Sequence, residues 1–474
     1  MSIPVISVEQ MREWEKASWA AGKSETDVIR RVGKILAQEA LSLTQANDSI
    51  LILAGKGHNG DDARCAREHL RERRVEVLDI KDAEADFPKL DAQLRSRPTL
   101  IIDGLFGIGI NRPLDHAWVK LIDRVNASRL AVLAVDVPSG LNADSGEPQG
   151  AAIEAAVTLT VGAPKTGLLK LSAARYVGRL VVAQDTGLID CPHQSDRQWI
   201  SAKDFCGFPP RRPVAGHKGT FGHLAIIAGS VGYHGAAVLA SRGAQRAQPG
   251  LITLFAQKDA YVPIAAQLQA VMVHLWPPEK PLPANFSAVM AGPGLASPEV
   301  PEELKQTVRR LWSESPTPVL ADASALDWLP GGPCPKNAVR VLTPHPGEAA
   351  RLLKTTAARV QEDRAGALRE ISRQLGNAWV VLKGHQTLIG RSEGEIFVNS
   401  SGNPFLGQGG SGDTLSGYLA GLLAQPALQE DAGRTIRFAV WQHGAAADFL
   451  SRTQPNWVVE DLVETLGEAG REIR

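Results

Sequence analysis

The sequence predicts an α/β protein of two domains, an N-terminal three-layer α/β/α domain and a C-terminal α/β domain. The chain has 474 residues, whereas a single domain holds roughly 100–250. Short apolar runs alternate with amphipathic segments along the chain, which is typical of parallel strands joined by helices. A proline-rich stretch without periodicity, Ile189–Val214, divides these runs into two sets and is expected to be a linker. We therefore expect domains at residues 1–210 and 211–474.

Each expected strand is a short apolar run. In the first half the runs are Ile50–Ala54, Val75–Ile80, Leu100–Asp103, Leu130–Val135, Ala156–Val161 and Leu180–Val182. In the second half they are Leu224–Ala228, Leu251–Phe255, Ala288–Ala291, Val319–Ala321, Val341–Thr343 and Trp379–Lys383. Two further runs, Thr387–Gly390 and Ile396–Asn399, predict a hairpin. Ligands of such sheets bind at the carboxyl ends of the strands, so binding residues are expected in the loops that follow strands.

The composition favours a small-molecule enzyme inside the cell. Lys plus Arg and Asp plus Glu both total 51, and the isoelectric point is about 7.2, so nothing indicates binding to nucleic acid or membrane. The four cysteines have no metal-binding spacing and are expected to be reduced thiols. No signal peptide and no long apolar segment is evident. We expect a cytoplasmic protein.

The most informative motif is Gln408-Gly-Gly-Ser-Gly-Asp413-Thr-Leu-Ser-Gly417, which precedes an apolar, helix-like stretch. Its glycines allow several backbone N–H groups to point at one anion, and a helix starting near Asp413 would add the positive end of its dipole. Asp413 is then placed to take a proton from a hydroxyl that attacks a phosphoryl group. The alternative is a glycine-rich loop in which Asp413 only caps the helix.

Three loops in the first half also follow expected strands. They are Gly55–Ala63, ahead of an expected helix at Arg64–Arg71, then Asp103–Gly109 and Asp136–Gly140. A glycine-rich turn between strand and helix is suited to a phosphate or dinucleotide. Asp103 and Asp136 could hold a cation, and Asp136 could move a proton; alternatively, both only cap turns.

The second half resembles the ADP- or ATP-dependent NAD(P)H-hydrate dehydratases, which have a ribokinase-like fold. The resemblance rests on motifs that occur in the family's order: His217–Gly222, Ala228–Ser230, Ala291–Leu295, Thr343–Glu348, Val381–Gly384 and Gly409–Asp413. It implies that the ring hydroxyl of the hydrate is phosphorylated and that phosphate then leaves.

This resemblance also implies the roles of individual residues. Asp413 would be the base, and Gly412 would contact phosphate and nucleotide. The nucleotide pocket would be lined by Lys383, Gly384, His385, Gln386 and Thr387, and the hydrated dinucleotide would contact Ala236, Gly294 and His345. His345 could instead only fill a rigid turn between two prolines. ADP or ATP is the implied cofactor, with ADP preferred for a fused arrangement, and Mg²⁺ would neutralise phosphate charge.

Residues 5–190 resemble the NAD(P)H-hydrate epimerase domain, a Rossmann-like fold often fused ahead of the dehydratase, and include Gly162–Leu168. The resemblance implies K⁺ coordination by Asn59, Asp103 and Ser139, and Asp136 would assist the exchange of configuration at the hydrated carbon. The expected hydrate pocket comprises Asp136 with His58, Asn59, Gly60, Asp61, Asp62, Gly107, Ile108, Gly109, Ile110, Asn111, Arg112 and Pro113.

Several positions depart from the family patterns. Asp61 replaces a glycine, Arg30 a glutamate and Ser324 an aspartate, and Phe405 and Leu406 are inserted before Gly407. The leading hypothesis is a bifunctional epimerase and dehydratase, which is expected to form homo-oligomers as the family often does. The alternatives are a dehydratase whose N-terminal domain is weakened or only structural, a ribokinase-like small-molecule kinase, and a nucleotide-binding protein without activity.

Overall fold

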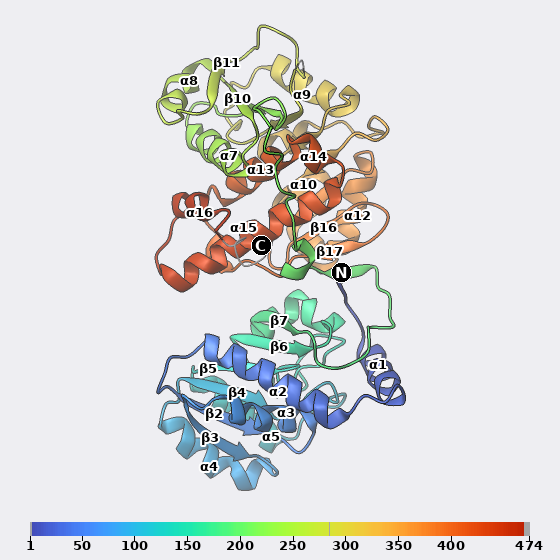
Figure 1. Cartoon of the computed structure of the whole chain (residues 1–474), viewed down its shortest axis with the longest axis vertical. Helices are drawn as coiled ribbons and strands as arrows, with labels where there is room; N and C mark the ends of the chain where they lie inside the picture. Colours follow the sequence, from blue (N-terminus) through green and yellow to red (C-terminus); the bar gives the residue numbers. More distant parts are fainter. Residues whose placement is uncertain (1, 284, 469–474) are drawn as a thin grey trace. The chain divides into compact units, whose positions relative to one another are not determined.

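The computed structural model describes residues 2–283 and 285–468, and its contacts form two compact units (Figure 1). One unit comprises residues 3–196, and the other comprises Ser2 together with the residues from Arg197 onward. Two α/β units agree with the predicted fold class. The contacts divide the chain after Asp196, whereas the boundary expected from the sequence lies near residue 210.

The reason for this difference is a strand inside the expected linker. β8 (Arg197–Trp199) pairs with β17 (Ile396–Val398) in the second unit. The buried Phe205 follows it and packs against the rings of Phe438 and Trp441, with centroid distances of 5.5 and 5.6 Å. These partners lie about 200 residues away in sequence, so a local pattern could not indicate them.

The N-terminal unit contains a parallel sheet in the order β3-β2-β4-β5-β6-β7. Its helices cover both faces, as predicted for a three-layer domain (Figure 1). Leu51 and Leu53 pack with α4 and α5, whereas Ile50 and Ile52 pack with α2 and α3. Alternate residues of β2 therefore face opposite layers, as the twofold side-chain period of a strand requires.

The elements of this unit follow one another in the expected α/β alternation. They are β1 (Ile3–Pro4), α1 (Val8–Ala20), α2 (Glu25–Ser42), β2 (Ser49–Ala54), α3 (His58–Ala66), β3 (Arg74–Asp79), α4 (Ala83–Arg95), β4 (Leu100–Gly104), α5 (His116–Ala127), β5 (Ala131–Val135), β6 (Val157–Val161), α6 (Ala174–Val177) and β7 (Arg179–Ala183).

The order of the sheet reverses between β2 and β4, and clefts of doubly wound sheets form at such a point. The loops after these two strands lie in close contact. A Cβ atom added at Gly55 would lie 2.1 Å from the carbonyl oxygen of Leu105, so only glycine fits there. The helix after β2 begins at His58, earlier than the expected Arg64, and most of the glycine-rich segment is therefore the first turns of α3.

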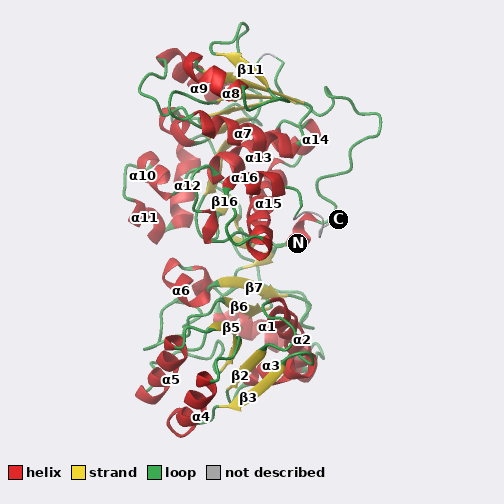
Figure 2. Ribbon diagram, turned by 90° about the vertical axis from the view of Figure 1, so that its left-hand side faces the viewer, coloured by secondary structure: helices red, strands yellow, loops and turns green. Residues whose placement is uncertain are grey.

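The sheet of the C-terminal unit runs in the order β8-β17-β16-β15-β14-β13-β12-β9-β10-β11. Strands β16 and β17 form the predicted hairpin, with Leu388 opposite Val398. The pairs from β15 to β11 are parallel. Helices α7, α13 and α15 share one buried core with the sheet, and Figure 2 shows α10, α11 and α12 on the opposite side from α15 and α16.

The strands of this unit match the predicted runs, with β8 and β11 as additions. The strands are β9 (His223–Ile227), β10 (Leu251–Ala256), β11 (Met272–Leu275), β12 (Ala288–Ala291), β13 (Val319–Ala321), β14 (Arg340–Leu342), β15 (Trp379–Leu382) and β16 (Leu388–Gly390), besides β8 and β17. The helices are α7 (His234–Ala247), α8 (Lys258–Ala265), α9 (Glu302–Glu314), α10 (Pro346–Leu352), α11 (Ala357–Glu362), α12 (Arg364–Gln374), α13 (Ser411–Leu423), α14 (Pro426–Gln429), α15 (Ala432–Thr453) and α16 (Val459–Thr465).

Helix α13 is buried along nearly its whole length and packs closely on α7. A Cβ added at Gly417 would lie 1.9 Å from the carbonyl oxygen of Ala240, and one at Gly243 would lie 2.4 Å from that of Thr414. The two backbones therefore touch where these glycines face each other. This contact fixes the position of the first turn of α13, which carries Asp413.

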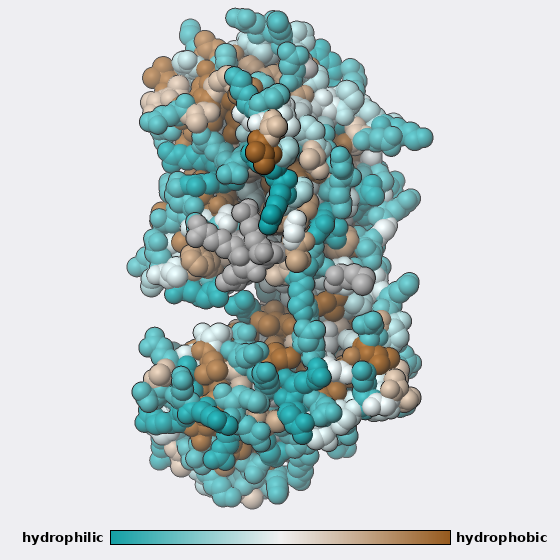
Figure 3. Space-filling model, viewed as in Figure 1, coloured by the Kyte–Doolittle hydropathy of each residue, from teal (hydrophilic) through white to brown (hydrophobic). Residues whose placement is uncertain are grey.

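The outer surface carries mainly hydrophilic side chains on the face drawn in Figure 3, with hydrophobic ones in small groups. No helix within the described residues is both long and apolar enough to cross a bilayer. The four cysteines are free thiols.

Because α7 and α13 touch, adding a single methyl group between them should destabilise the protein. Gly417→Ala should lower the free energy of unfolding by about 1–3 kcal/mol, because overpacking forces the helices apart. The matched variant is Gly235→Ala in α7, where an added Cβ meets no atom within 4 Å; it should be neutral or stabilising by up to about 1 kcal/mol. Urea unfolding followed by circular dichroism measures both, and a Gly417→Ala midpoint equal to that of the wild type would contradict the packing.

Candidate active sites

The predicted loops of the C-terminal unit gather at one edge of its sheet. β12, β13, β14 and β15 are parallel neighbours, so their carboxyl ends meet there. The backbone N–H of Lys383, after β15, donates to the carbonyl of Pro344, after β14, at 2.9 Å. The backbone N–H of Asp322, after β13, donates to the carbonyl of Ala291 at 3.1 Å. The strand-end loops therefore form one continuous surface.

The glycine-rich motif forms the start of α13, as predicted. Gly410 precedes the helix with φ of 96°, and a Cβ there would also lie 2.4 Å from Leu239. Within the described chain, the amides of Gly412 and Asp413 donate to no carbonyl, as is usual in a first helical turn. Asp413 is partly exposed at this turn, so an anion and a hydroxyl can both reach it.

Lys383 lies beside this turn among carboxylates. Its Nζ is 3.1 Å from Asp322 Oδ1 and 3.8 Å from Glu348 Oε2, and a Cβ added at Gly412 would lie 3.3 Å from it. Burial alone lowers the pKa of Lys383, but the neighbouring carboxylates outweigh burial and raise it above its ordinary value. The ammonium therefore stays charged next to Gly412.

Asp413 lies near the same carboxylates, and the positive charge of Lys383 offsets only part of their effect on its pKa. Burial, and next the Asp322 carboxylate, raises the pKa of Asp413 to about 7, although Lys383 opposes the shift. A carboxylate with a pKa near neutrality is a stronger base than an ordinary aspartate, and a substantial fraction of it is ionised at neutral pH. The turn thus combines a proton acceptor, unpaired amides and a fixed cation.

The segment Lys383–Thr387 connects β15 to β16 and is held by a residue that the sequence did not reveal. Arg364, at the start of α12, donates to the carbonyls of Leu382 at 3.1 Å and Gln386 at 3.4 Å, and also to that of His385. Burial lowers the pKa of Arg364 to about 10. Gly384 has φ of 131°, and a Cβ added there would lie 3.4 Å from the guanidinium of Arg364, so the loop lies directly against this side chain.

The residues expected to contact the hydrate lie in two neighbouring loops. Gly294, with φ of 66°, lies against α7: a Cβ added there would be 3.2 Å from the Cβ of Ala236. His345 caps α10, since its Nδ1 accepts from Gly347 at 3.0 Å, and the ring is about half exposed. His345 therefore does cap a turn, and its Nε2 lies 3.6 Å from Oε1 of Glu348, the other member of this cap.

Hydrogen bonds hold the segment around the inserted residues Phe405 and Leu406 in place. Asn403 donates to Asp448 at 3.0 Å, and the hydroxyl of Ser411 donates to the carbonyl of Leu406 at 2.7 Å. Below the loop, His443 Nε2 lies 3.1 Å from the carbonyl of Ser411. Burial lowers the pKa of His443 to about 4, so the ring is neutral and supports the loop through a hydrogen bond. The inserted residues therefore leave the turn at Gly410–Asp413 intact.

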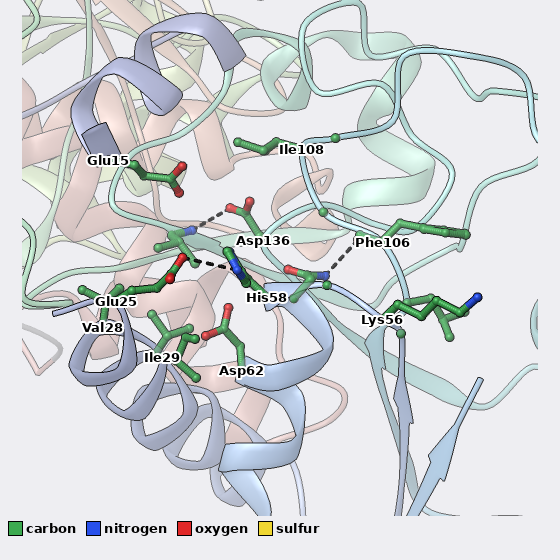
Figure 4. A pocket seen from close by; sticks show the side chains of 18 of the residues that line it. Glu15, Glu25, Val28, Ile29, Lys56, His58, Asp62, Phe106, Ile108 and Asp136 are labelled. Carbon is green, nitrogen blue, oxygen red and sulfur yellow. Dashed lines mark hydrogen bonds and ion pairs between the residues drawn. The ribbon is translucent and has the colours of Figure 1, made fainter. Parts of the chain in front are cut away.

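The N-terminal unit contains a cavity of about 640 Å³ at the switch point of its sheet (Figure 4). Its walls come from α1, α2, α3 and the loops after β2, β4 and β5. Ionisable side chains that line it include Glu15, Glu25, Lys56, His58, Asp62 and Asp136.

Asp136 is fixed by a buried lysine. Lys165 Nζ donates to Asp136 Oδ1 at 2.6 Å, and its other two N–H groups reach Val161 O at 2.8 Å and Thr160 Oγ1 at 3.0 Å. The lysine side chain is fully buried. Asp136 also has φ of 62°, an unusual conformation for a residue with a side chain. The sequence placed Lys165 in a motif but did not indicate this partner.

Asn59, Asp103 and Ser139 meet beneath the loop after β4. Ser139 Oγ donates to Asp103 Oδ1 at 2.6 Å, and the amide of Asn59 donates to Phe106 O at 2.8 Å. Burial raises the pKa of Asp103 to about 6, although hydrogen bonds from Ser139 oppose it. The three side chains offer a carboxylate, an amide oxygen and a hydroxyl, which suit a hard cation.

The other expected pocket residues divide into three groups. His58, Asn59 and Asp62 line the cavity, as do Gly107, Ile108 and Gly109. The segment from Ile110 to Pro113 lines an adjoining cavity of about 520 Å³, which shares Phe106 and Trp118. Gly60 and Asp61 are not among the lining residues: Gly60 packs against Gly55 O, 2.2 Å from where its Cβ would be, and Asp61 pairs with Arg64 at 2.8 Å.

Asp61 and Arg30, the two charged residues that depart from the family pattern in this unit, both form ion pairs at the surface. Arg64, which pairs with Asp61, also reaches Asp79 at 2.7 Å. Arg30 pairs with Asp27 at 2.9 Å on the exposed side of α2. Neither substitution places an unpaired charge in the cavity. In the described part of the chain, no three His, Cys, Asp or Glu side chains form a metal-binding group in either unit.

Comparison with known proteins places both units in one family. The NAD(P)H-hydrate dehydratase family matches residues 224–467, and the family described as YjeF-related protein N-terminus matches residues 78–167. The bifunctional NAD(P)H-hydrate repair enzyme of Gloeobacter violaceus is 34% identical over 94% of this chain and 93% of its own. That of Coxiella burnetii is 33% identical over 93% of each chain, and that of Escherichia coli is 30% identical over 95% and 91%.

Solved structures resemble the C-terminal unit. The ADP/ATP-dependent NAD(P)H-hydrate dehydratase of Bacillus subtilis, co-crystallised with ATP and Mg²⁺, is 30% identical, with a TM-score of 0.52 over 58% of this chain and 98% of that one. A ribokinase-like superfamily protein of Enterococcus faecalis is 24% identical, with a TM-score of 0.50 over 59% and 98%, and shows the fold alone. Since the full-length relatives carry both units in one chain, this protein belongs to the family of bifunctional NAD(P)H-hydrate repair enzymes.

Proposed function

We propose that the protein repairs hydrated nicotinamide cofactors in two steps, one in each unit. The N-terminal unit interconverts the R and S hydrates of NADH and NADPH, and the C-terminal unit dehydrates the S form with ADP or ATP. The observation that carries the second step is the first turn of α13, where Asp413 lies beside unpaired amides and near Lys383. Family membership supports the pairing of the two activities.

In the C-terminal unit Asp413 takes the proton of the ring hydroxyl as that oxygen attacks the terminal phosphoryl group of the nucleotide. The amides of Gly412 and Asp413 and the ammonium of Lys383 stabilise the charge that develops on the phosphoryl oxygens. The phosphate ester then loses phosphate, and the neighbouring ring carbon loses a proton, which restores the double bond of the dihydronicotinamide. Ala236, Gly294 and His345 are the proposed contacts of the hydrate.

The nucleotide is proposed to lie along Lys383, Gly384, His385, Gln386, Thr387 and Gly412. Arg364 keeps this loop in place through its carbonyl groups. Bound Mg²⁺ would neutralise charge on the transferred phosphate. The described residues offer only the carboxylates of Asp322, Glu348 and Asp413 nearby, two of which pair with Lys383, so phosphate oxygens and water would supply most of its ligands. ADP stays the preferred nucleotide.

In the N-terminal unit Asp136 is proposed to move a proton during exchange at the hydrated carbon, with the hydrate in the cavity of Figure 4. Asn59, Asp103 and Ser139 fit K⁺ through their oxygen atoms, and K⁺ would supply a fixed positive charge near the substrate. The dehydratase-only alternative rests on Asp61 and Arg30, yet both of these charges are paired outside the cavity. A cytoplasmic location and a homo-oligomer stay predictions.

Asp413→Asn removes the base and leaves the glycine turn unchanged. Dehydration of the S hydrate should fall by about 100- to 10,000-fold, as is usual for loss of a general base, while nucleotide affinity stays within a few fold. Turnover by NADH absorbance and binding by calorimetry measure the two effects. A variant that keeps near-full turnover would refute the role of Asp413.

The pH dependence of dehydration should report the same group. Because the base must be ionised and its pKa is about 7, kcat/KM should be constant above that pH and fall about tenfold per pH unit below it. Arg64→Lys, in the other unit, is a matched control that should leave this profile unchanged. A profile flat down to pH 5 would show that the base has a pKa well below 7, which would contradict the environment described for Asp413.

Asp136→Asn should separate the two activities. The exchange of R and S hydrates should fall by at least about 100-fold, because the amide cannot accept the proton. Dehydration of pure S hydrate should be unchanged. Chromatography of the two hydrates measures the exchange, and the simultaneous loss of both activities would mean that the two sites have been assigned wrongly.

A further inference from the structure

The cavity of the N-terminal unit contains two aspartates in opposite environments. Figure 4 shows Asp62, from α3, and Asp136, from the loop after β5, on the same open space. Asp136 is ion-paired with Lys165 at 2.6 Å and also accepts from the backbone N–H of Val161 at 2.9 Å. Hydrogen bonds and a cation of this kind stabilise the ionised form of a carboxyl group.

Asp62 has none of these partners. It is buried to 8% relative exposure in the cavity wall, and no described residue donates a hydrogen bond or forms an ion pair with its side chain. The charged groups that act on it are Asp136, Asp61 and Glu15, all of them acidic. A carboxylate that is buried without a donor or a cation is costly, so the neutral acid is the favoured form.

The basic side chains that line the cavity, those of Arg12, Lys56, His58 and Lys81, are not among the groups that act on Asp62. His58 pairs with Glu25 at 3.3 Å, and Lys165 uses its three N–H groups on Asp136, Val161 and Thr160. The α2 residues that line this side, Val28, Ile29 and Val32, are apolar. Burial, then Asp136, raises the pKa of Asp62 to about 8, which agrees with the geometry.

We infer that Asp62 is the general acid of the exchange reaction: it donates a proton to the hydroxyl that leaves the hydrated ring, while Asp136 accepts a proton from the water that replaces it. This inference rests on the proposed epimerase function of the N-terminal unit. One carboxyl group with a cation and hydrogen-bond donors, beside a second that has neither, is the arrangement that acid–base pairs use.

The step balances without a further reagent. Water adds to an enamine with its hydroxyl on the carbon next to nitrogen, because the nitrogen lone pair stabilises a cation at that carbon. The C–O bond therefore breaks with proton transfer from Asp62, and one water molecule and a ring iminium form. A second water attacks the opposite face and gives its proton to Asp136. A proton then returns from Asp136 to Asp62 through cavity water.

The test uses the full-length protein and pure R hydrate without nucleotide, so that only exchange is observed. Asp62→Asn should lower the enzymatic rate by about 100-fold or more, with KM within a few fold because asparagine has the same shape. The wild-type rate should fall above about pH 8 as Asp62 ionises, and the variant should lose this alkaline fall. Exchange in H₂¹⁸O should place one ¹⁸O in the product hydroxyl.

Two variants make the assignment specific. Glu68→Gln changes an exposed carboxylate of the same unit and should keep the wild-type rate. Glu15→Gln tests the other acid of the cavity: a larger loss there than in Asp62→Asn would overturn the inference in favour of Glu15. Three further results would overturn the inference. They are an exchange rate in Asp62→Asn within threefold of the wild-type rate, a rate of this variant that still falls at alkaline pH, and exchange that places no ¹⁸O in the product.

Folding and the underlying function are controlled in the same preparations. Removing an unpaired buried carboxylate should leave Asp62→Asn at least as resistant to heat as the wild type at pH 9, where the wild-type group is ionised. A lower midpoint there would contradict the environment deduced for Asp62. If the wild type itself exchanges no hydrate, the proposed epimerase function fails and the inference fails with it, whereas an active wild type with an active Asp62→Asn variant refutes the inference alone.

Discussion

The proposed C-terminal site depends on one mostly buried ammonium, which lies among carboxylates. Lys383 lies between Asp322 and Glu348, and without its charge these groups and Asp413 would repel one another in a poorly solvated region. Breaking such a buried pair costs several kcal/mol because an uncompensated charge remains. The pair also fixes where the cation lies relative to Gly412. The glycine turn, Asp413 and the proposed nucleotide loop all lie around the ammonium of Lys383.

The N-terminal unit uses a similar device for a different purpose. Lys165 is fully buried and holds Asp136 at the rim of a cavity, whereas the neighbouring Asp62 is left without a cation. In the C-terminal site the lysine moderates the pKa of one base; in the N-terminal site it distinguishes two carboxyl groups of one cavity. In both units the site lies at the carboxyl ends of parallel strands, where loops can vary without disturbing the sheet.

The strands and the loops that follow them could be predicted from the sequence, because apolar runs and glycine punctuation are local signals. The start of α13 and the position of Asp413 were predicted for the same reason. The ion-pair and hydrogen-bond partners of these residues could not be predicted from the sequence. Lys383 meets Asp322 across 61 residues, Lys165 meets Asp136 across 29, and Arg364 reaches the carbonyl of Leu382 across 18. Strand β8 was not predicted, because its pairing partner β17 lies about 200 residues further along the chain.

The most direct test of the account is one incubation of mixed R and S hydrates of NADH with the protein, Mg²⁺, K⁺ and excess ADP or ATP. A bifunctional enzyme converts the whole mixture to NADH at a rate above that of spontaneous exchange, with one phosphate released per NADH formed. Conversion of the S share alone would leave the N-terminal cavity without its proposed activity. Formation of a stable phosphorylated product, or no conversion at all, would contradict the central claim that the turn before Asp413 brings nucleotide phosphate to the hydroxyl of a hydrated nicotinamide.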